Sequence, residues 1–256
     1  MIDTHVHVLD PEKYPYPPDS LGYTPGPEES GTLGTLEQLM DAHGIEGAVL
    51  VAASVYGDDN RAMLDAFAAH PDRYRIIAGV SVNDVKAIEK LAATPGVVGI
   101  RLNLVDDSSQ SGATTIARLM DAALEAGLSV SVQAAPTTAA NVLTNVREGH
   151  VILDHFGRPD LEGGIGTLRE ISQRPDTWLK LSAGFRIAGS CKPSEAPLLR
   201  EAVAAFSEDR LIWGSDWPFI NFSGQKPDYA SVLQMGPALS KADFARNSRA
   251  LFWEQT

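Results

Sequence analysis

Apolar, β-branched segments alternate with amphipathic helical patterns along all 256 residues of the chain. The apolar segments are nearly continuous in valine, isoleucine and leucine, which is typical of parallel strands buried on both faces. Strand–helix alternation repeated eight times favours the α/β class, and within it a somewhat distorted (β/α)8 TIM barrel over a doubly wound sheet. The eight predicted strands are Ile2–Val8, Gly47–Ala53, Arg75–Val82, Val97–Asn103, Leu128–Ala134, His150–His155, Thr177–Ala183 and Leu211–Asp216.

The segments between these strands carry helical patterns. In one of them Ile116, Leu119, Met120 and Ala123 recur at the spacing of a helix face. Glycine or proline closes several of the segments, as after His43. The predicted helices are Thr35–His43, Asn60–His70, Asp84–Ala93, Ala113–Ala126, Thr138–Arg147 and Gly166–Arg174. A chain of this length suits one barrel, so residues 1–256 are predicted to form a single domain.

The composition excludes several classes of partner. The formal net charge of -12 disfavours binding to nucleic acid or to an anionic membrane. Cys191 is the single cysteine, so no intrachain disulfide forms, and a reducing interior is the natural environment. No apolar run approaches the length of a membrane span, and the first strand begins at once. We therefore expect a cytoplasmic protein with a small-molecule partner, and the oligomeric state stays open.

Two irregular stretches follow predicted strands. Pro11–Ser30 contains six prolines and comes directly after the first strand, and Phe219–Tyr229 comes after the eighth. Active sites of barrels lie at the carboxyl ends of the strands. Loops at that end commonly form lids or walls for the substrate, and we expect these two to do so.

The first strand carries two histidines, His5 and His7, on the same face because side chains alternate along a strand. Two neighbouring imidazoles are costly to bury without partners. A metal, a carboxylate or an anionic ligand would stabilise them. The alternative is a pair of structural histidines.

Two more strands end in polar side chains. The sixth ends in Asp154-His155 and then turns at a glycine, and the eighth ends in Asp216, two residues before a proline. Taken alone, Asp216 could be a turn residue or a helix cap. Together with the first strand, these residues place imidazoles and a carboxylate at one mouth of the predicted barrel.

These segments carry a family resemblance. His5-Val-His7, Asp154-His-Phe-Gly-Arg-Pro159 and Gly214-Ser-Asp-Trp-Pro218 resemble motifs of the amidohydrolase superfamily, and more narrowly its "amidohydrolase 2" branch of lactone-processing enzymes. Further segments agree with this resemblance, which runs from residue 2 to Phe252. They are Pro15-Tyr16-Pro17, Ser54-Val-Tyr-Gly-Asp-Asp-Asn60, Gly99-Ile-Arg-Leu-Asn103 and Lys180-Leu-Ser-Ala-Gly-Phe-Arg186.

The departures from the wider superfamily concern the metal. Metal-dependent members usually add a histidine on strand five and, when binuclear, a bridging lysine on strand four. This chain has Gln133 on strand five, and no histidine lies between His70 and His150. The resemblance to the lactonase branch therefore implies catalysis with no required cofactor. The alternative is one Zn²⁺ held by His5, His7 and Asp216, with His155 as a further candidate.

The resemblance implies an enzyme that hydrolyses a lactone, a cyclic carboxylic ester. Asp216 is the expected base for the attacking water, and His5, His7 and His155 are the expected donors to the carbonyl and to the leaving oxygen. A lactone isomerase that migrates the ring between its 1,4 and 1,5 forms would use the same residues. A single-zinc hydrolase or decarboxylase is a third hypothesis, and a non-enzymatic binding protein on a barrel is a fourth.

Three arginines suit an anionic substrate. Arg101 lies inside an apolar strand, where the alternative is a buried ion pair. Arg158 and Arg186 follow strands six and seven, where the alternative is a surface charge. By resemblance they bind a carboxylate through forked hydrogen bonds. Val105–Gln110 lacks the additional arginine expected for a doubly charged pyrone, which favours a sugar-acid lactone with one carboxylate or several hydroxyls.

Other polar residues are candidates for contacts with substrate hydroxyls. They are Ser54, Tyr56 and Asn60 after the second strand, Tyr16 after the first, and Gln133 on the fifth. The alternatives are loop packing for the tyrosines and a helix N-terminus for Asn60.

The remaining histidines, His43, His70 and His150, are interpreted as structural. Cys191 has no nearby histidine, so it is not proposed as a nucleophile.

Overall fold

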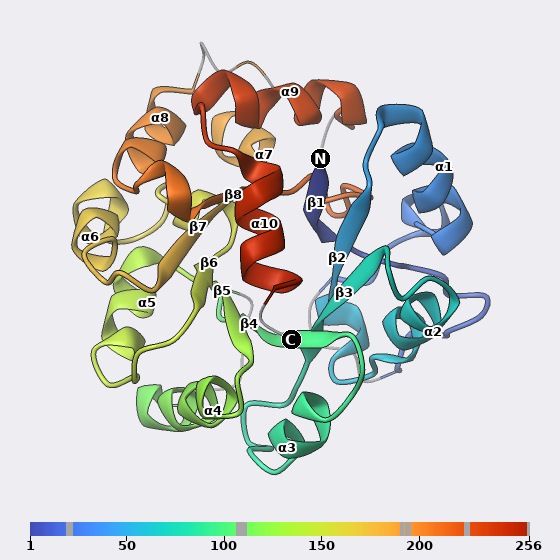
Figure 1. Cartoon of the computed structure of the whole chain (residues 1–256), viewed down its shortest axis with the longest axis horizontal. Helices are drawn as coiled ribbons and strands as arrows, with labels where there is room; N and C mark the ends of the chain where they lie inside the picture. The colour runs from blue at the N-terminus through green and yellow to red at the C-terminus, as the bar shows by residue number, and fades with distance from the viewer. Residues whose placement is uncertain (19–22, 106–111, 190–191, 193–195, 223–225, 255–256) are drawn as a thin grey trace.

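The computed structural model describes residues 1–18, 23–105, 112–189, 192, 196–222 and 226–254. Its strands form one parallel sheet in which each pairs with the next in the sequence (Figure 1). They are β1 (Ile2–Val6), β2 (Gly47–Val51), β3 (Tyr74–Gly79), β4 (Val97–Asn103), β5 (Ser129–Gln133), β6 (Val151–Leu153), β7 (Thr177–Leu181) and β8 (Leu211–Trp213). A parallel bridge between Val6 and Trp217 brings β1 beside the segment that follows β8. The predicted (β/α)8 barrel is confirmed.

Helices surround the strands in the order of the chain (Figure 1). They are α1 (Leu33–His43), α2 (Arg61–Ala69), α3 (Ala87–Ala92), α4 (Ala113–Glu125), α5 (Pro136–Leu143), α6 (Gly164–Ile171), α7 (Gly184–Ala188), α8 (Pro197–Ala204), α9 (Tyr229–Leu239) and α10 (Phe244–Phe252). Short 3-10 turns are Pro27–Glu29, Ser54–Tyr56, His155–Gly157 and Glu208–Arg210. The first six helices match predicted ones, although α1, α5 and α6 begin two residues earlier than predicted.

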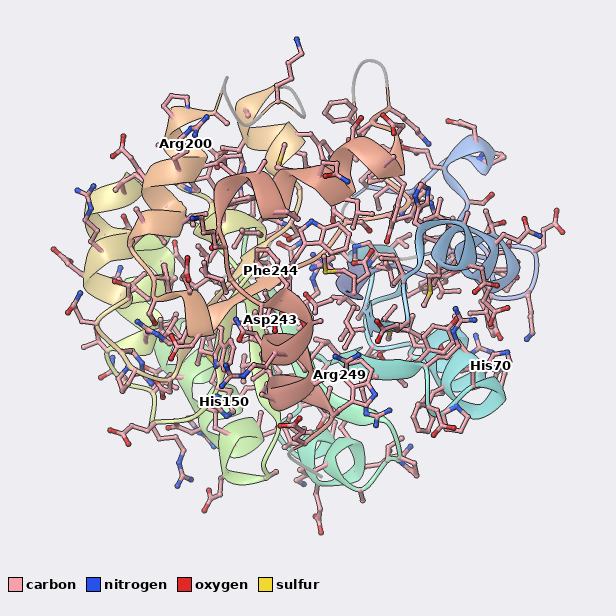
Figure 2. All side chains as sticks on the ribbon, turned by 45° about the horizontal axis from the view of Figure 1, so that its top comes forward. His70, His150, Arg200, Asp243, Phe244 and Arg249 are labelled. Atoms are coloured by element: carbon pink, nitrogen blue, oxygen red, sulfur yellow. The ribbon has the colours of Figure 1, made fainter. Side chains whose placement is uncertain are left out.

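Helix α10 covers one end of the barrel (Figure 1). Asp243 caps its N-terminus: the carboxylate accepts a hydrogen bond from the Arg246 amide (Figure 2 labels Asp243). Near its other end, Leu251 and Phe252 pack into the barrel interior. The strand residues they join there are Val49, Val51, Ile77, Ile152 and Ile212. This apolar packing closes the end at which the strands begin and leaves the carboxyl ends for a site.

Several predicted strands end early at that open end. Strand β1 stops at Val6, β6 at Leu153 and β8 at Trp213. The extensions predicted for β6 and β8 fail because His155 (φ 54°) and Asp216 (φ 68°) adopt left-handed backbone, which a strand excludes. His7, His155 and Asp216 therefore lie just after their strands, whereas His5 lies within β1.

Within the described ranges, no helix combines the length and the apolar character needed to cross a bilayer.

Candidate active site

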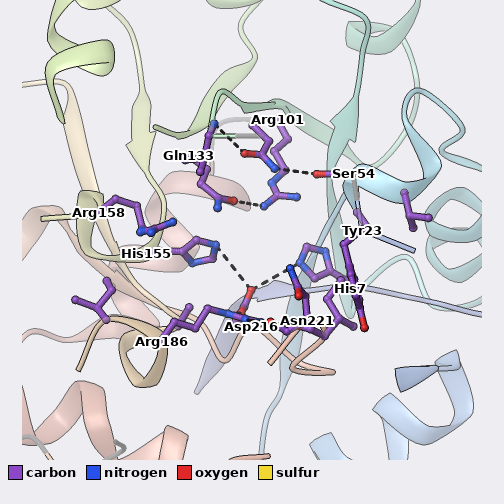
Figure 3. A pocket seen from close by; sticks show the side chains of 17 residues that line it. His7, Tyr23, Ser54, Arg101, Gln133, His155, Arg158, Arg186, Asp216 and Asn221 are labelled. Carbon is purple, nitrogen blue, oxygen red and sulfur yellow. Dashed lines mark hydrogen bonds and ion pairs between the residues drawn. The ribbon is translucent and has the colours of Figure 1, made fainter. Parts of the chain in front are cut away.

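A cavity of about 210 Å³ lies at the carboxyl ends of the strands. Three residues predicted to be catalytic, His7, His155 and Asp216, line it (Figure 3). The residues predicted to bind substrate that line it are Ser54, Arg101, Gln133, Arg158 and Arg186. A cavity of this size suits a small, compact substrate.

Three imidazoles converge on one oxygen of Asp216. The Oδ1 atom lies 3.7 Å from His5 Nε2 and 3.8 Å from both His7 Nε2 and His155 Nε2. These separations exceed the length of a hydrogen bond, so the four groups surround a common point without hydrogen-bonding to one another through these atoms. The His5 ring lies between the other two, with ring centroids 5.0 Å from His7 and 4.8 Å from His155. The catalytic set predicted from the sequence is therefore assembled in space.

The backbone around this cluster is strained. His155 and Asp216 both have positive φ, a conformation that costs a side-chain-bearing residue about 1–3 kcal/mol. Neighbouring hydrogen bonds hold it: the Asp216 amide donates to the His5 carbonyl at 2.9 Å, and the His7 amide donates to the Trp217 carbonyl at 2.9 Å. The contact between β1 and the chain after β8 thus fixes the carboxylate relative to the histidines.

Contacts of the inner ring nitrogens orient two of the histidines. His7 Nδ1 lies 2.8 Å from the Val51 carbonyl oxygen, which only accepts, so this nitrogen carries a hydrogen. His155 Nδ1 lies 2.8 Å from the hydroxyl of Ser182. In both rings Nε2 is left to face the cavity.

Burial shifts the pKa values of these groups. It lowers the pKa of His5 well below 6.5, and it lowers the pKa of His155 to about 4. For Asp216, burial by itself would raise the pKa, but the His155 imidazole and the Arg186 guanidinium outweigh it. The pKa of this carboxyl lies well below its usual value, so Asp216 is ionised at neutral pH.

Arg186 is the direct partner of that carboxylate. Its Nε donates to Asp216 Oδ2 at 3.0 Å, and its two other nitrogens donate to the carbonyls of Ile220 (2.6 Å) and Asn221 (3.1 Å). It lies on α7, whereas the sequence predicted a loop. Because Arg186 occupies Oδ2, the Oδ1 atom is the one left to face the imidazoles.

The two other arginines reach the cavity from different elements. Arg101 on β4 donates to Gln133 Oε1 at 2.7 Å and to the Ala52 carbonyl at 2.8 Å (Figure 3). Its Nε lies 3.8 Å from Asp154 Oδ2, so Arg101 lines the cavity and also takes part in a buried ion pair. Arg158 makes a two-point contact with Asp160, at 3.0 and 2.9 Å.

Comparison with known proteins places the chain in a family. Residues 2–252 match the model of the amidohydrolase family. The chain belongs to the amidohydrolase family. This confirms the resemblance on which the predicted site rests, and it makes the protein a hydrolase.

Named relatives of this amidohydrolase act on lactones. It is 28% identical to 4-sulfomuconolactone hydrolase of Rhizobium radiobacter, over 91% of this chain and 81% of that protein. It is 27% identical to 2-pyrone-4,6-dicarboxylate hydrolase of Comamonas testosteroni, over 99% and 90%. Among solved structures, a probable 2-pyrone-4,6-dicarboxylic acid hydrolase of Acinetobacter baumannii with citric acid bound is similar, with a TM-score of 0.83, 26% identity and 98% of both chains covered.

Three residues predicted to contact substrate do not line the cavity of this amidohydrolase. The Tyr56 hydroxyl donates to the Tyr14 carbonyl at 3.0 Å, and the Tyr16 ring lies 5.2 Å from that of Tyr56. The Asn60 side chain bridges both backbone groups of Gly79, at 2.7 and 2.9 Å. The contacts of the two tyrosines are those of loop packing, whereas Asn60 precedes α2 without capping it by its side chain.

The histidines interpreted as structural lie outside the cavity. His43 stacks near Tyr229, His70 pairs with Glu37 and His150 accepts from the Trp178 indole (Figure 2 labels His70 and His150). Cys191 and positions 106–110 of the Val105–Gln110 stretch lie outside the described residues.

The sequence reasoning missed a buried pair beneath the histidines. Lys180 on β7 and Asp154 after β6 are both 0% exposed, and Lys180 Nζ lies 2.9 Å from Asp154 Oδ1. Burial would raise the pKa of Asp154, but Lys180 and His5 hold it well below its usual value. A lysine within the apolar run Thr177–Leu181 carried the same signal as Arg101, because an isolated charge in a buried strand needs a partner.

A metal ion would find candidate ligands here. Among the described residues, His5, His7 and Asp216 each offer an atom within 4.8 Å of the others. Proteins usually supply about three ligands to a catalytic zinc. These distances alone therefore do not decide whether a metal ion is the cofactor. Whether the residues fit one depends on which ring nitrogens of His5 and His7 carry a hydrogen.

Proposed function

We propose that this amidohydrolase hydrolyses a small lactone that carries a carboxylate. One observation carries the proposal: Asp216 Oδ1 faces three imidazole nitrogens at 3.7–3.8 Å at a cavity lined by arginines. A base, hydrogen-bond donors and a cation at one point are the groups that ester hydrolysis of an anion needs. The lactone-hydrolase names of the relatives support the substrate class.

In the first step water attacks the lactone carbonyl carbon. Asp216 Oδ1 takes a proton from the water as the new C–O bond forms and the carbonyl oxygen becomes negative. Arg186 keeps the carboxylate ionised and directs Oδ1 toward the water. General-base assistance of this kind contributes about 10²–10⁴-fold to the rate.

In the second step the ring C–O bond breaks and the leaving oxygen takes a proton. His7 suits this role: its Nδ1 donates to the Val51 carbonyl, so its Nε2 can take the proton that Asp216 accepted from the water and pass it to the leaving oxygen. This transfer returns Asp216 to its ionised form. His5 and His155 remain to hydrogen-bond the carbonyl oxygen as its charge grows. The product is a ring-opened acid, which releases a proton at neutral pH.

The cavity charge favours an anion with one carboxylate. Three arginines and one aspartate line it, within a protein of net charge -12. Arg186 and Arg158 already donate to the carboxylates of Asp216 and Asp160, whereas Arg101 lies 3.8 Å from that of Asp154. Arg101 is therefore the arginine proposed to hold the substrate carboxylate. Ser54 and Gln133 also line the cavity and can hydrogen-bond ring hydroxyls. A sugar-acid or muconate-type lactone with a single carboxylate fits this set better than a pyrone dicarboxylate.

The mechanism requires no cofactor, because the residues present supply the base, the acid and the donors. A screen of sugar-acid, muconate-type and pyrone lactones by proton release, with and without chelator, tests the proposal. We expect release with a monocarboxylated lactone that chelator leaves unchanged. Activity lost on chelation and restored by Zn²⁺ would overturn the metal-independent mechanism, and no release with any of these lactones would overturn the lactonase.

NMR of the same reactions separates hydrolysis from ring migration. Hydrolysis gives the open acid, whereas an isomerase gives a mixture of 1,4- and 1,5-lactones with no net proton release. We expect the open acid, and a mixture of ring forms would replace the lactonase with the isomerase.

A further inference from the structure

Lys180 makes three contacts inside the barrel. Its Nζ lies 2.9 Å from Asp154 Oδ1, 3.3 Å from His5 Nδ1 and 3.4 Å from Ser131 Oγ. An ammonium has three hydrogens and no acceptor, so these three contacts use all of its donors. The Ser131 hydroxyl is free to accept, because its own hydrogen goes to Asp154 Oδ1 at 2.7 Å.

The contact with His5 fixes where that ring carries its hydrogen. A nitrogen that accepts from Lys180 has no hydrogen of its own, so the hydrogen of the His5 ring is on Nε2. The opposite tautomer would bring two donors face to face. It would also have to reach Asp154 Oδ1 across 3.6 Å, which is longer than a hydrogen bond.

The Nε2 hydrogen of His5 lacks an acceptor within the protein as described. His5 is 0% exposed, and its Nε2 has no hydrogen-bond partner among the residues that the structure describes. This nitrogen lies 3.7 Å from Asp216 Oδ1, at the point where the attacking water and the carbonyl meet in the proposed function. A buried donor without a partner, this close to the proposed base, is suited to bind a developing oxyanion.

We propose that Lys180 is a positioning residue that locks His5 as the Nε2–H tautomer, and so makes it a hydrogen-bond donor to the substrate carbonyl. This inference rests on the proposed function for the identity of the acceptor, but the tautomer itself does not depend on it. Asp154 holds the ammonium in place, and neither residue touches the substrate.

The same tautomer does not fit a metal. A ring nitrogen that carries a hydrogen has no lone pair for an ion, and metal-bound histidines instead donate from their other nitrogen. His7 has that orientation, because its Nδ1 donates to the Val51 carbonyl, and His5 has the reverse. The set of His5, His7 and Asp216 therefore loses one of its three ligands.

Histidine ¹⁵N NMR of the substrate-free protein tests the tautomer. Substituting His5 and His7 by glutamine one at a time assigns their signals. We expect His5 with hydrogen on Nε2 only and His7, the internal control, with hydrogen on Nδ1. His5 with hydrogen on Nδ1 would overturn the inference, whatever the lactone screen shows; a negative screen beside an Nε2–H signal would overturn the proposed function alone.

A double variant tests the part played by Lys180. Removing Lys180 by itself would leave Asp154 as an unpaired buried charge, so Lys180→Met is combined with Asp154→Asn. We expect loss of the single Nε2–H signal and a fall in kcat of about 10²–10³-fold with KM little changed. Ser131→Ala, which touches Lys180 but not His5, is expected to keep the tautomer. An unchanged His5 signal in the folded double variant would overturn the role of Lys180.

Discussion

At the scale of single residues, the state of Asp216 depends on Arg186. The guanidinium donates to Oδ2 at 3.0 Å, and it is one of the groups that hold the carboxyl pKa well below its usual value. If that cation is removed, the pKa of the Asp216 carboxyl rises, because burial raises it and one of the groups that lower it is gone. The base would then be protonated, and so inactive, over a wider range of acid pH.

The variant Arg186→Gln is therefore expected to move the acid limb of the kcat/KM profile to higher pH. The pH–rate profile on one lactone measures it. Arg186→Lys, which keeps the charge, is the matched control and should move the limb less. An acid limb at the same pH in Arg186→Gln and wild type would contradict the pairing of Arg186 with the base.

Much of the proposed catalytic set could be predicted at this scale. His5, His7, His155 and Asp216 stand at strand ends in short motifs, and strand ends of a parallel barrel meet at one face. The partners of Arg186 and Lys180 could not be predicted, because they come from residues 30 and 26 positions away whose approach depends on the closed barrel. Asn60 was predicted to contact the substrate, but its side-chain amide hydrogen-bonds the Gly79 backbone and does not line the cavity.

At the scale of elements, closure between β1 and the chain after β8 places the site. Gly214 lies just after β8, and a Cβ there would stand 2.6 Å from His5 Cβ and 2.7 Å from the His5 amide nitrogen. Glycine is needed for this close approach. Any larger residue would push β1 and its histidines away from Asp216.

Gly214→Ala is expected to lower the free energy of unfolding by about 1–3 kcal/mol and to lower kcat, since His5 moves. Urea unfolding and initial rates measure the two effects. Gly34→Ala, in the first turn of α1, is the control: nothing lies within 4 Å of its added Cβ, so it should change neither stability nor kcat by a comparable amount. Equal stability of Gly214→Ala and wild type would contradict the tight closure.

Elements with strong local patterns were predictable, and those that depend on tertiary contacts were less so. The eight strands follow from their continuous apolar runs. Helix α7 is five residues long, too short for a periodic signal. The position of α10 depends on the packing of Leu251 and Phe252 into the barrel, which is a tertiary contact. The ends of β6 and β8 were overestimated, because left-handed backbone at His155 and Asp216 has no sequence signature beyond the nearby glycine and proline.

At the scale of the whole molecule, the buried histidines link stability to pH. Burial lowers the pKa of His155 to about 4 in the folded state, against 6.5 when unfolded. Arg101 and Arg186 act in the same direction, while Asp216 and Asp154 oppose the shift. Between these values the unfolded chain binds more protons, so the free energy of unfolding falls as pH falls. Above 6.5 neither state binds the proton, and this contribution is constant.

We expect a loss of up to about 1.4 kcal/mol per pH unit from His155 between pH 6.5 and 4, with His5 adding in the same direction. The pKa values of Asp154 and Asp216 are lowered from 3.8, so their contribution to the free energy of unfolding is lost only below pH 3.8, outside the range in which His155 acts. Urea unfolding at several pH values measures the slope, and His155→Gln should reduce it. A slope in that variant as steep as in wild type would contradict the assignment.

The central claim is that Asp216 is the base of a lactone hydrolase, and Asp216→Asn tests it most directly. Proton release on the same lactone should show kcat lowered by about 10²–10⁴-fold with KM little changed, in a variant that still folds and unfolds cooperatively. Asp41→Asn, at a surface pair with Arg73, should keep full activity. Turnover by folded Asp216→Asn close to that of wild type would contradict the claim.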